Sequence, residues 1–295
     1  MCERTYWPIQ HHTDMTLEQF KKILDEFHNL TALSLTGIGE PFLNRDLTKM
    51  IRYAKSKGIF VTVTTNATLI NEMTARGVIG CGLDELSFSM ESADPTTFEK
   101  IRVGARFDRI VANMRTFMKV KDHMRSRTPE VVLRSVAMSH TVHEVPGLVK
   151  LAHELGIRHL NITPLVFPFM PDLGDPRADV ARNVHREAKA LAKRLGVELE
   201  WDIIGRAQLR AGSCIVPYHT PYVFKEGYVG PCCLVNQRNA RDWVIKNYTF
   251  GNVLGEGFAS IQNNRTFREF RRKLLSSKPT EIPDICKGCW ILFKD

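Results

Sequence analysis

The sequence predicts an α/β fold, in which a parallel sheet occupies most of the chain and a smaller unit follows it. Three observations support this prediction. Short β-rich runs begin near residues 33, 59, 85, 131 and 159. A stretch with helical periodicity separates each run from the next, which is the pattern of repeated βαβ units. This alternation stops around residues 205–213, and hairpin-like runs follow. The pattern fits either an open doubly wound sheet or a barrel.

A helix is expected ahead of the first run. Thr16 and Gln19 have the spacing of a capping box, and apolar residues recur at helical spacing from Leu17 to Phe27. Further helices are predicted near residues 47–56, 70–79, 95–102, 106–125, 144–155 and 178–195, and Gly58, Gly156 and Gly196 are positioned as their C-caps. The β-rich stretch 197–201 closes this part of the chain.

The last third has a different organisation. Residues 222–229 read as a hairpin around a Lys-Glu-Gly turn, and a helix is expected near 261–275. We therefore divide the chain into a first domain, residues 1–205, and a second domain, residues 206–295.

Composition excludes several classes of protein. Of the 295 residues, 43% are hydrophobic and 25% charged, which argues against a disordered chain, a collagen or a coiled coil. No apolar run approaches the roughly 18 residues of a membrane span, and no signal segment is evident, so the cytoplasm is the expected compartment and no membrane partner is expected. The net charge of +9 permits an anionic partner. The basic run 265–273 fits a solvated helix face better than a nucleic-acid site.

Cysteines give the strongest chemical signal. Five of the seven lie in the last third: Cys214, Cys232, Cys233, Cys286 and Cys289. In a cytosolic chain such a cluster indicates metal ligation rather than disulfides. The Cys-x-x-Cys pair lets two thiolates reach one metal, and two more distant cysteines complete a four-sulfur shell. Thiolate ligands alone do not distinguish Zn²⁺ from an iron–sulfur cluster.

Polar and glycine residues gather where the predicted strands end. The first strand ends in Thr36-Gly37-Ile38-Gly39-Glu40-Pro41, the second in Thr64-Thr65-Asn66, and the third runs through Ser89 to Glu91. Carboxyl ends of parallel strands line the ligand-binding mouth in either architecture. Glycines let a ligand approach the backbone, although the first turn by itself is also explained as a simple strand-to-helix connection.

These three segments together resemble radical S-adenosylmethionine (SAM) enzymes. Gly39-Glu40-Pro41 is similar to the end of their GGEP motif, with Ile38 at its first glycine. Thr64-Thr65-Asn66 resembles their TTNG strand end, with Ala67 in the glycine place, and residues 87–102 resemble the segment that follows. The resemblance implies a partial (β/α)6 TIM-like barrel that lacks its first strand. It also implies SAM-binding positions at Gly37, Gly39, Glu40, Pro41, Asn66, Ser89 and Glu91.

The second domain is similar to the SPASM or twitch iron–sulfur domain of these enzymes. The resemblance implies one auxiliary [4Fe–4S] cluster with four cysteine ligands: Cys214, Cys232, Cys286 and Cys289. Cys232 is favoured over Cys233 because it directly follows the hairpin and Pro231. By resemblance, the intact enzyme cleaves SAM reductively to a 5′-deoxyadenosyl radical, which abstracts hydrogen from a small-molecule or peptide substrate. A flavodoxin or ferredoxin would supply electrons. No residue is assigned a catalytic role.

The chain departs from the family pattern at its front. These enzymes hold the catalytic [4Fe–4S] cluster on Cys-x-x-x-Cys-x-x-Cys after the first barrel strand, and Cys2 resembles only the last of these ligands. Cys81 precedes its strand and cannot replace the others. We therefore expect a chain truncated within the motif and inactive as given. Two alternatives remain: a pseudoenzyme with one metal centre, Fe–S or structural Zn²⁺, or ligands supplied by another chain. Loss of the first strand would leave an unpaired edge beside the strand at Leu33, which soluble proteins avoid, and helix 17–27, which should cover that strand, is retained; both points favour truncation.

Overall fold

The computed structural model describes residues 13–37, 39–164, 177–201, 214–233, 235, 241–286 and 289. The chain forms two compact units: Thr31–Ile203 makes up the first, whereas Cys2–Leu30 and Ile204–Asp295 together make up the second. Within the described residues no helix is long and apolar enough to cross a bilayer.

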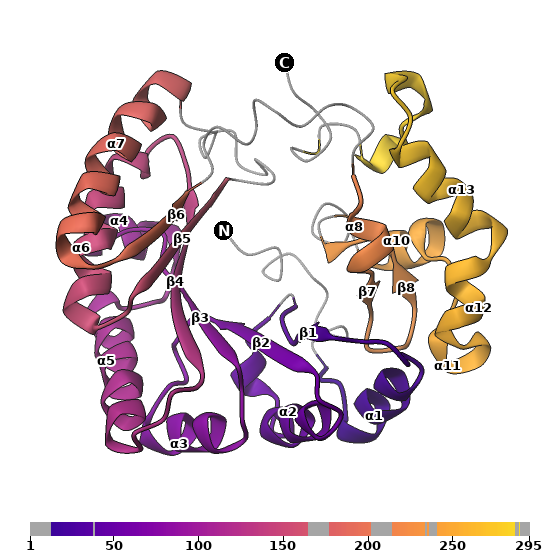
Figure 1. Cartoon of the computed structure of the whole chain (residues 1–295), viewed down its shortest axis with the longest axis horizontal. Coiled ribbons are helices and arrows are strands. Elements are labelled where there is room, and N and C mark those ends of the chain that lie inside the picture. Colours follow the sequence, from indigo (N-terminus) through magenta and orange to yellow (C-terminus); the bar gives the residue numbers. More distant parts are fainter. Residues whose placement is uncertain are drawn as a thin grey trace. The chain divides into compact units, whose positions relative to one another are not determined.

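The first unit is built on a six-stranded parallel sheet (Figure 1). Its strands are β1 (Ala32–Ser34), β2 (Phe60–Thr65), β3 (Glu85–Ser89), β4 (Glu130–Ala137), β5 (His159–Pro164) and β6 (Glu198–Trp201). They lie side by side in the order in which the chain makes them. A doubly wound sheet would reverse its strand order at a switch point, so this order selects the barrel-like alternative. The predicted strands and the partial TIM-like fold are confirmed.

Helices cover the outer face of this curved sheet (Figure 1). They are α2 (Leu47–Ser56), α3 (Glu72–Gly80), α4 (Pro95–Ile101), α5 (Phe107–His123), α6 (Val145–Leu155) and α7 (Ala178–Leu195), with short 3₁₀ turns η3 (Pro41–Leu43) and η4 (Val142–Glu144). Phe88 of β3 meets Phe117 of α5 edge to face, with ring centroids 5.6 Å apart. Residues of the other parity, such as Glu85 and Ser87, point to the opposite, concave face, because side chains alternate along a strand.

Strand β1 is an edge of the sheet. Among the described residues it pairs only with β2, in the parallel register Ala32 to Phe60. This agrees with the edge expected near Leu33. The edge strand is short, three residues, which limits the unpaired backbone that it offers.

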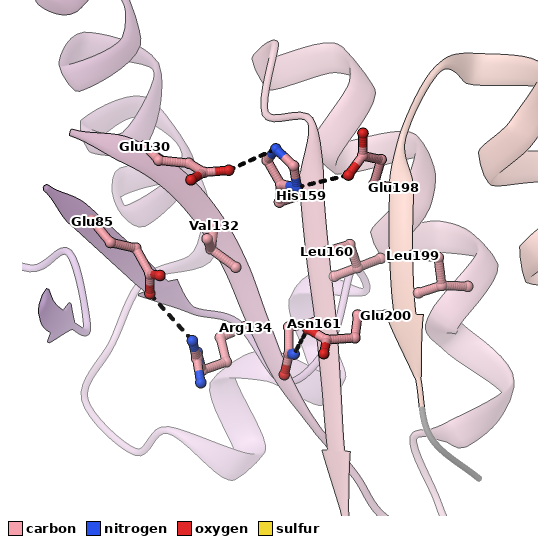
Figure 2. A pocket seen from close by; sticks show the side chains of 10 residues that line it. All are labelled: Glu85, Glu130, Val132, Arg134, His159, Leu160, Asn161, Glu198, Leu199 and Glu200. Carbon is pink, nitrogen blue, oxygen red and sulfur yellow. Dashed lines mark hydrogen bonds and ion pairs between the residues drawn. The ribbon is translucent and has the colours of Figure 1, made fainter. Parts of the chain in front are cut away.

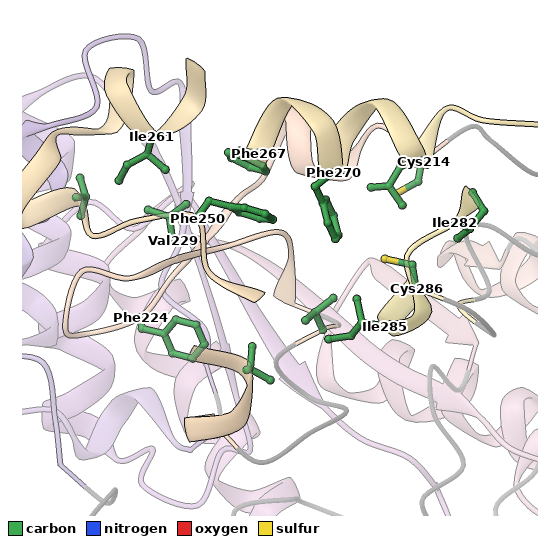
Figure 3. Close-up of a cluster of buried hydrophobic side chains, with 14 of the residues drawn as sticks. Cys214, Phe224, Val229, Phe250, Ile261, Phe267, Phe270, Ile282, Ile285 and Cys286 are labelled. Carbon is green, nitrogen blue, oxygen red and sulfur yellow. The ribbon is translucent and has the colours of Figure 1, made fainter. Parts of the chain in front are cut away.

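The second unit contains α8 (Val216–His219), the antiparallel hairpin β7 (Tyr222–Val223) and β8 (Val229–Gly230), α10 (Arg241–Tyr248), α11 (Val253–Glu256), α12 (Phe258–Asn263), α13 (Arg265–Leu274), η7 (Pro279–Glu281) and η8 (Asp284–Cys286). Its hydrophobic core is drawn in Figure 3. Phe250 and Phe267 stack there with centroids 4.1 Å apart. The predicted hairpin is confirmed.

Helix α1 (Leu17–Asp25) belongs to this second unit. Its capping box forms as predicted, since Thr16 Oγ1 accepts from the Gln19 amide at 3.2 Å and Gln19 Oε1 accepts from the Thr16 amide at 2.9 Å. Ile23 is part of the second unit's core, and Phe27 stacks on Phe258 at 4.2 Å. The sequence assigned this helix to the first domain as cover for a missing strand; its apolar face is instead used by the second unit.

Candidate functional site

The turn after β1 is held to the end of β2 by one carboxylate. Glu40 accepts hydrogen bonds from Thr65 Oγ1 at 2.6 Å, from the Asn66 amide at 2.8 Å and from the Phe42 amide at 3.3 Å. The last of these caps η3, which begins at Pro41. Gly39 has φ +139°, a conformation that side-chain-bearing residues rarely adopt. The turn is therefore fixed by contacts that are distant in sequence.

Burial raises the pKa of the Glu40 carboxyl, and its hydrogen bonds and the positive charge of Arg102 lower it only in part. A carboxyl in such a place serves mainly as a fixed acceptor for backbone groups. The hydrogen bonds to Glu40 thus hold the short Gly-Glu-Pro turn in one conformation.

The end of β2 forms a second fixed turn. Asn66 Oδ1 accepts from the amide and the hydroxyl of Thr68, at 2.9 and 2.6 Å. Ala67 has φ +61°, and Asn113 Nδ2 donates to its carbonyl at 2.8 Å. Ala67 stands in the glycine place of the motif that this strand end resembles, and it adopts the left-handed conformation that glycine favours there.

Glu91, after β3, is almost fully buried, with 3% of its surface exposed. Arg102 at the end of α4 grips it in a two-point ion pair: Nη2 lies 2.6 Å from Oε1, and Nε contacts Oε2. Since both Glu91 oxygens are engaged, its role here is to hold Arg102. Arg102 also acts electrostatically on Glu40. The structure thus brings Glu40, Asn66 and Glu91 together at neighbouring strand ends.

Ser89 is the last residue of β3 and is only half-buried. Gly37 and Pro41 lie in the same turn as Glu40. Thr65 and Arg102 complete the constellation, although sequence reasoning did not single them out as site residues. Their position at two strand or helix ends beside the motifs was the available signal.

A separate polar hollow of about 460 Å³ lies on the concave face, at the amino ends of the strands (Figure 2). His159 lies between two carboxylates, with Nε2 2.8 Å from Glu130 and Nδ1 3.3 Å from Glu198. Arg134 Nη2 lies 3.3 Å from Glu85. The sequence analysis did not predict this network, which depends on the register of four strands. It joins strands at the end of the sheet opposite to Glu40.

Cys214 and Cys286 belong to the hydrophobic core of the second unit, and Cys232 packs against it. Cys214, Cys286 and Cys289 are buried, Cys232 is half-buried against the same core, and Cys233 is exposed. Figure 3 shows Cys214 and Cys286 among the core side chains. The Cys289 amide donates to the Cys286 carbonyl at 3.1 Å, so these two cysteines lie close together.

Burial raises the pKa of the Cys214 thiol, and the proximity of Cys289 raises it further. Such thiols stay protonated until a metal displaces their protons. Across the described residues, no three His, Cys, Asp or Glu side chains stand in a finished metal-holding arrangement. The donor set itself, soft thiolates gathered in one unit, fits an iron–sulfur cluster or zinc. Cys2 lies outside the described residues.

Cys81 is buried at the C-terminal end of α3, ahead of β3, where its thiol contacts the Val78 carbonyl at 3.1 Å. Burial raises the pKa of this thiol. It is an ordinary packed cysteine, as its place in the sequence indicated.

A partial parallel barrel with a fixed Gly-Glu-Pro turn, followed by a thiol-rich unit, defines a class of cofactor-dependent α/β proteins. Family comparison specifies the class. Residues 2–123 match the radical SAM superfamily, and residues 214–290 match SPASM, an iron–sulfur cluster-binding domain. The chain belongs to the radical SAM superfamily and carries a SPASM domain. These two domains imply [4Fe–4S] clusters as cofactors.

Known proteins similar to this chain include a tungsten-containing aldehyde ferredoxin oxidoreductase cofactor-modifying protein of Pyrococcus furiosus, 23% identical over 292 residues, covering 92% of this chain and 78% of that protein. A PqqA peptide cyclase of Xanthomonas campestris is 25% identical over 263 residues, covering 85% of this chain and 64% of that protein. The structure of Streptococcus suis SuiB bound to SAM superposes with a TM-score of 0.66 at 15% identity, covering 93% of this chain and 63% of SuiB. The chain thus spans less than two thirds of the last two.

Proposed function

We propose that this protein binds SAM at the carboxyl ends of β1, β2 and β3, carries one auxiliary [4Fe–4S] cluster in its second unit, and modifies a peptide or small-molecule substrate. The observation that carries the proposal is the Glu40 carboxylate, which joins the Gly-Glu-Pro turn to Thr65 and Asn66. Bound SAM supplies radical chemistry in this superfamily; the residues of this chain bind and orient it.

The binding surface is formed mainly by backbone. Glu40 uses its side chain on protein groups, so the groups left for SAM are the backbone of the turn and the polar atoms at the neighbouring strand ends. The proposed contacts are Gly37, Gly39, Glu40, Pro41, Asn66 and Ser89, and Glu91 is included in the proposed SAM site as an indirect participant. Glu91 acts through Arg102, which it holds in place at 2.6 Å.

The auxiliary cluster is assigned to Cys214, Cys232, Cys286 and Cys289. The SPASM match over residues 214–290 supports this assignment, and so does the position of Cys214 and Cys286 in one core, against which Cys232 packs. Cys232 is preferred to Cys233 because it packs against that core while Cys233 is exposed. A structural Zn²⁺ on the same thiols is the competing assignment.

Cys2 is proposed as a ligand of the SAM-binding cluster. The printed sequence offers no other cysteine before Cys81. A polypeptide of these 295 residues is therefore expected to retain the auxiliary cluster but not to cleave SAM. A ferredoxin or flavodoxin is the proposed electron donor, and the cytoplasm the proposed compartment.

Anaerobic reconstitution with iron and sulfide tests the cluster assignment. We expect about four irons per chain. Cys214→Ala and Cys289→Ala should abolish iron binding, whereas Cys81→Ala, the matched control, should leave the iron content unchanged. One zinc and no iron in the anaerobic protein, or full iron retention in Cys289→Ala, would contradict the assignment. SAM binding, measured separately by calorimetry, should weaken in Asn66→Ala.

A further inference from the structure

One residue of the basic run on α13 differs from its neighbours. Arg265, Arg268 and Arg272 are exposed, but Arg271 is 7% exposed. The prediction of a solvated helix face is therefore wrong for this residue. Arg271 follows the buried Phe267 by four positions, so it falls on the apolar stripe that faces the core.

Aromatic rings flank the Arg271 guanidinium. Its carbon lies 4.4 Å from the centre of the Phe267 ring and 5.1 Å from that of Tyr218. Nη2 donates to the Gln262 carbonyl, while Nε is buried and has no hydrogen-bond partner in the described part of the chain. The Nε side of the guanidinium is thus shielded from water, and its donor capacity there is unused.

No carboxylate of the described residues pairs with Arg271: its electrostatic neighbours are Tyr218 and Arg268, and burial lowers the pKa of the guanidinium. Burying a cation without an anion destabilises the folded protein, and proteins rarely tolerate it. The aromatic faces compensate only part of this cost. A negative charge close to the Arg271 guanidinium would compensate the remaining cost of its burial.

The place of Arg271 in the second unit indicates which anion this is. Phe267 belongs to the same core as Cys214 and Cys286. Tyr218 lies on α8, which begins two residues after Cys214. A cluster with four thiolate ligands is an anion, and one-electron reduction adds a further negative charge. Charges and hydrogen bonds around such a cluster set its reduction potential.

We propose that Arg271 is the counter-charge of the auxiliary cluster, and that its guanidinium favours the reduced form of that cluster. This inference rests on the auxiliary cluster of the proposed function. Arg271 acts here as a tuning residue: it does not ligate iron and does not touch substrate.

An EPR-monitored redox titration of the reconstituted full chain tests the proposal, in a Cys2→Ala background so that only the auxiliary cluster contributes. Arg271→Met should lower the equilibrium constant for one-electron reduction at least tenfold, which is a shift of 59 mV to more negative potential. The matched control is Arg268→Met, which removes the same charge from an exposed site on the same helix. Water and salt screen that charge, so its potential should stay that of the parent.

An unchanged potential in Arg271→Met, with the cluster present, would overturn the proposal and leave Arg271 a packing residue. Should that variant not fold, Arg271→Gln replaces it, because the amide keeps a donor for the Gln262 carbonyl while removing the charge; the same shift is expected. Failure of the proposed function looks different: the parent protein then binds no iron, or binds it independently of Cys289.

Discussion

The ion pair between Glu91 and Arg102 provides a quantitative test of the site's architecture. Replacing Arg102 by Met removes the partner of a carboxylate whose side chain is 4% exposed, while Arg102 itself is 21% exposed. Breaking a buried pair from one side costs about 3–5 kcal/mol, because the remaining charge stays buried. For a unit of this size we expect the melting temperature to fall by roughly 6–20 °C.

Urea unfolding followed by circular dichroism measures this loss. The matched control is Arg106→Met, since Arg106 lies 3.5 Å from Glu99 with side chains 77% and 41% exposed. An exposed pair of this kind contributes at most about 1 kcal/mol. The double variant Glu91→Met/Arg102→Met removes both charges and should recover most of the stability, because two well-packed apolar side chains can replace a buried pair.

Equal, small losses in Arg102→Met and Arg106→Met would refute the reasoning, since they would mean that Glu91 is solvated. A double variant as unstable as Arg102→Met alone would refute it in another way. In that case packing around the strand end, rather than the uncompensated charge, determines the loss.

Three further predictions follow from backbone and burial. Burial raises the pKa of the Glu40 carboxyl, so protonation of this group stabilises the folded protein. This contribution is fully present below the ordinary pKa of 4.5 and is lost as pH rises through the folded-state pKa. In urea titrations at several pH values, the protein should therefore lose stability relative to Glu40→Gln from about pH 4.5 upward. Ala67 has φ +61° and is fully buried. In thermal unfolding, the stability of Ala67→Gly should stay within about 1 kcal/mol of the parent. Ala67→Val should lose about 2 kcal/mol or more of stability, because a branched side chain disfavours this conformation. Gly227 has φ +89°, and an added Cβ would lie 2.5 Å from Asn252 Oδ1. Gly227→Ala should therefore lower the free energy of unfolding, measured by calorimetry, by about 2 kcal/mol or more. The control Gly255→Ala has open space around the added Cβ and should be neutral or stabilising.

The sequence predicted what local rules determine. The strands, the Thr16 capping box and the left-handed Gly156 and Gly196 depend on neighbours within a few residues, and all were found. The three motif segments marked the strand ends because their residues follow the strands directly. The link from Glu40 to Thr65 was not visible, since it depends on the register between two strands.

Two other features needed the tertiary structure. The apolar face of α1 predicted that this helix packs against another part of the protein, but an amphipathic pattern does not indicate which part. The sequence does carry a signal for the burial of Arg271: Phe267, Phe270 and Leu274 recur at helical spacing on α13, and Arg271 falls on the stripe that they form. The number of basic residues in the run does not show this burial, because a count of charges does not tell which side of the helix each residue occupies.

The attachment of α1 to the second unit has a consequence for the order in which the protein acquires its structure during synthesis. The segment that holds α1 is made before the sheet unit, but its core partners, such as Phe258, are made after that unit. At about 5–20 residues per second, the chain between Leu30 and Ile204 takes roughly 9–35 s to appear. During that interval the sheet unit can fold by adding one βα repeat after another, while the apolar side of α1 stays uncovered. Helix α1 is therefore among the last elements to reach its final packing, and until then the nascent chain exposes an apolar helix face that holdase chaperones can bind.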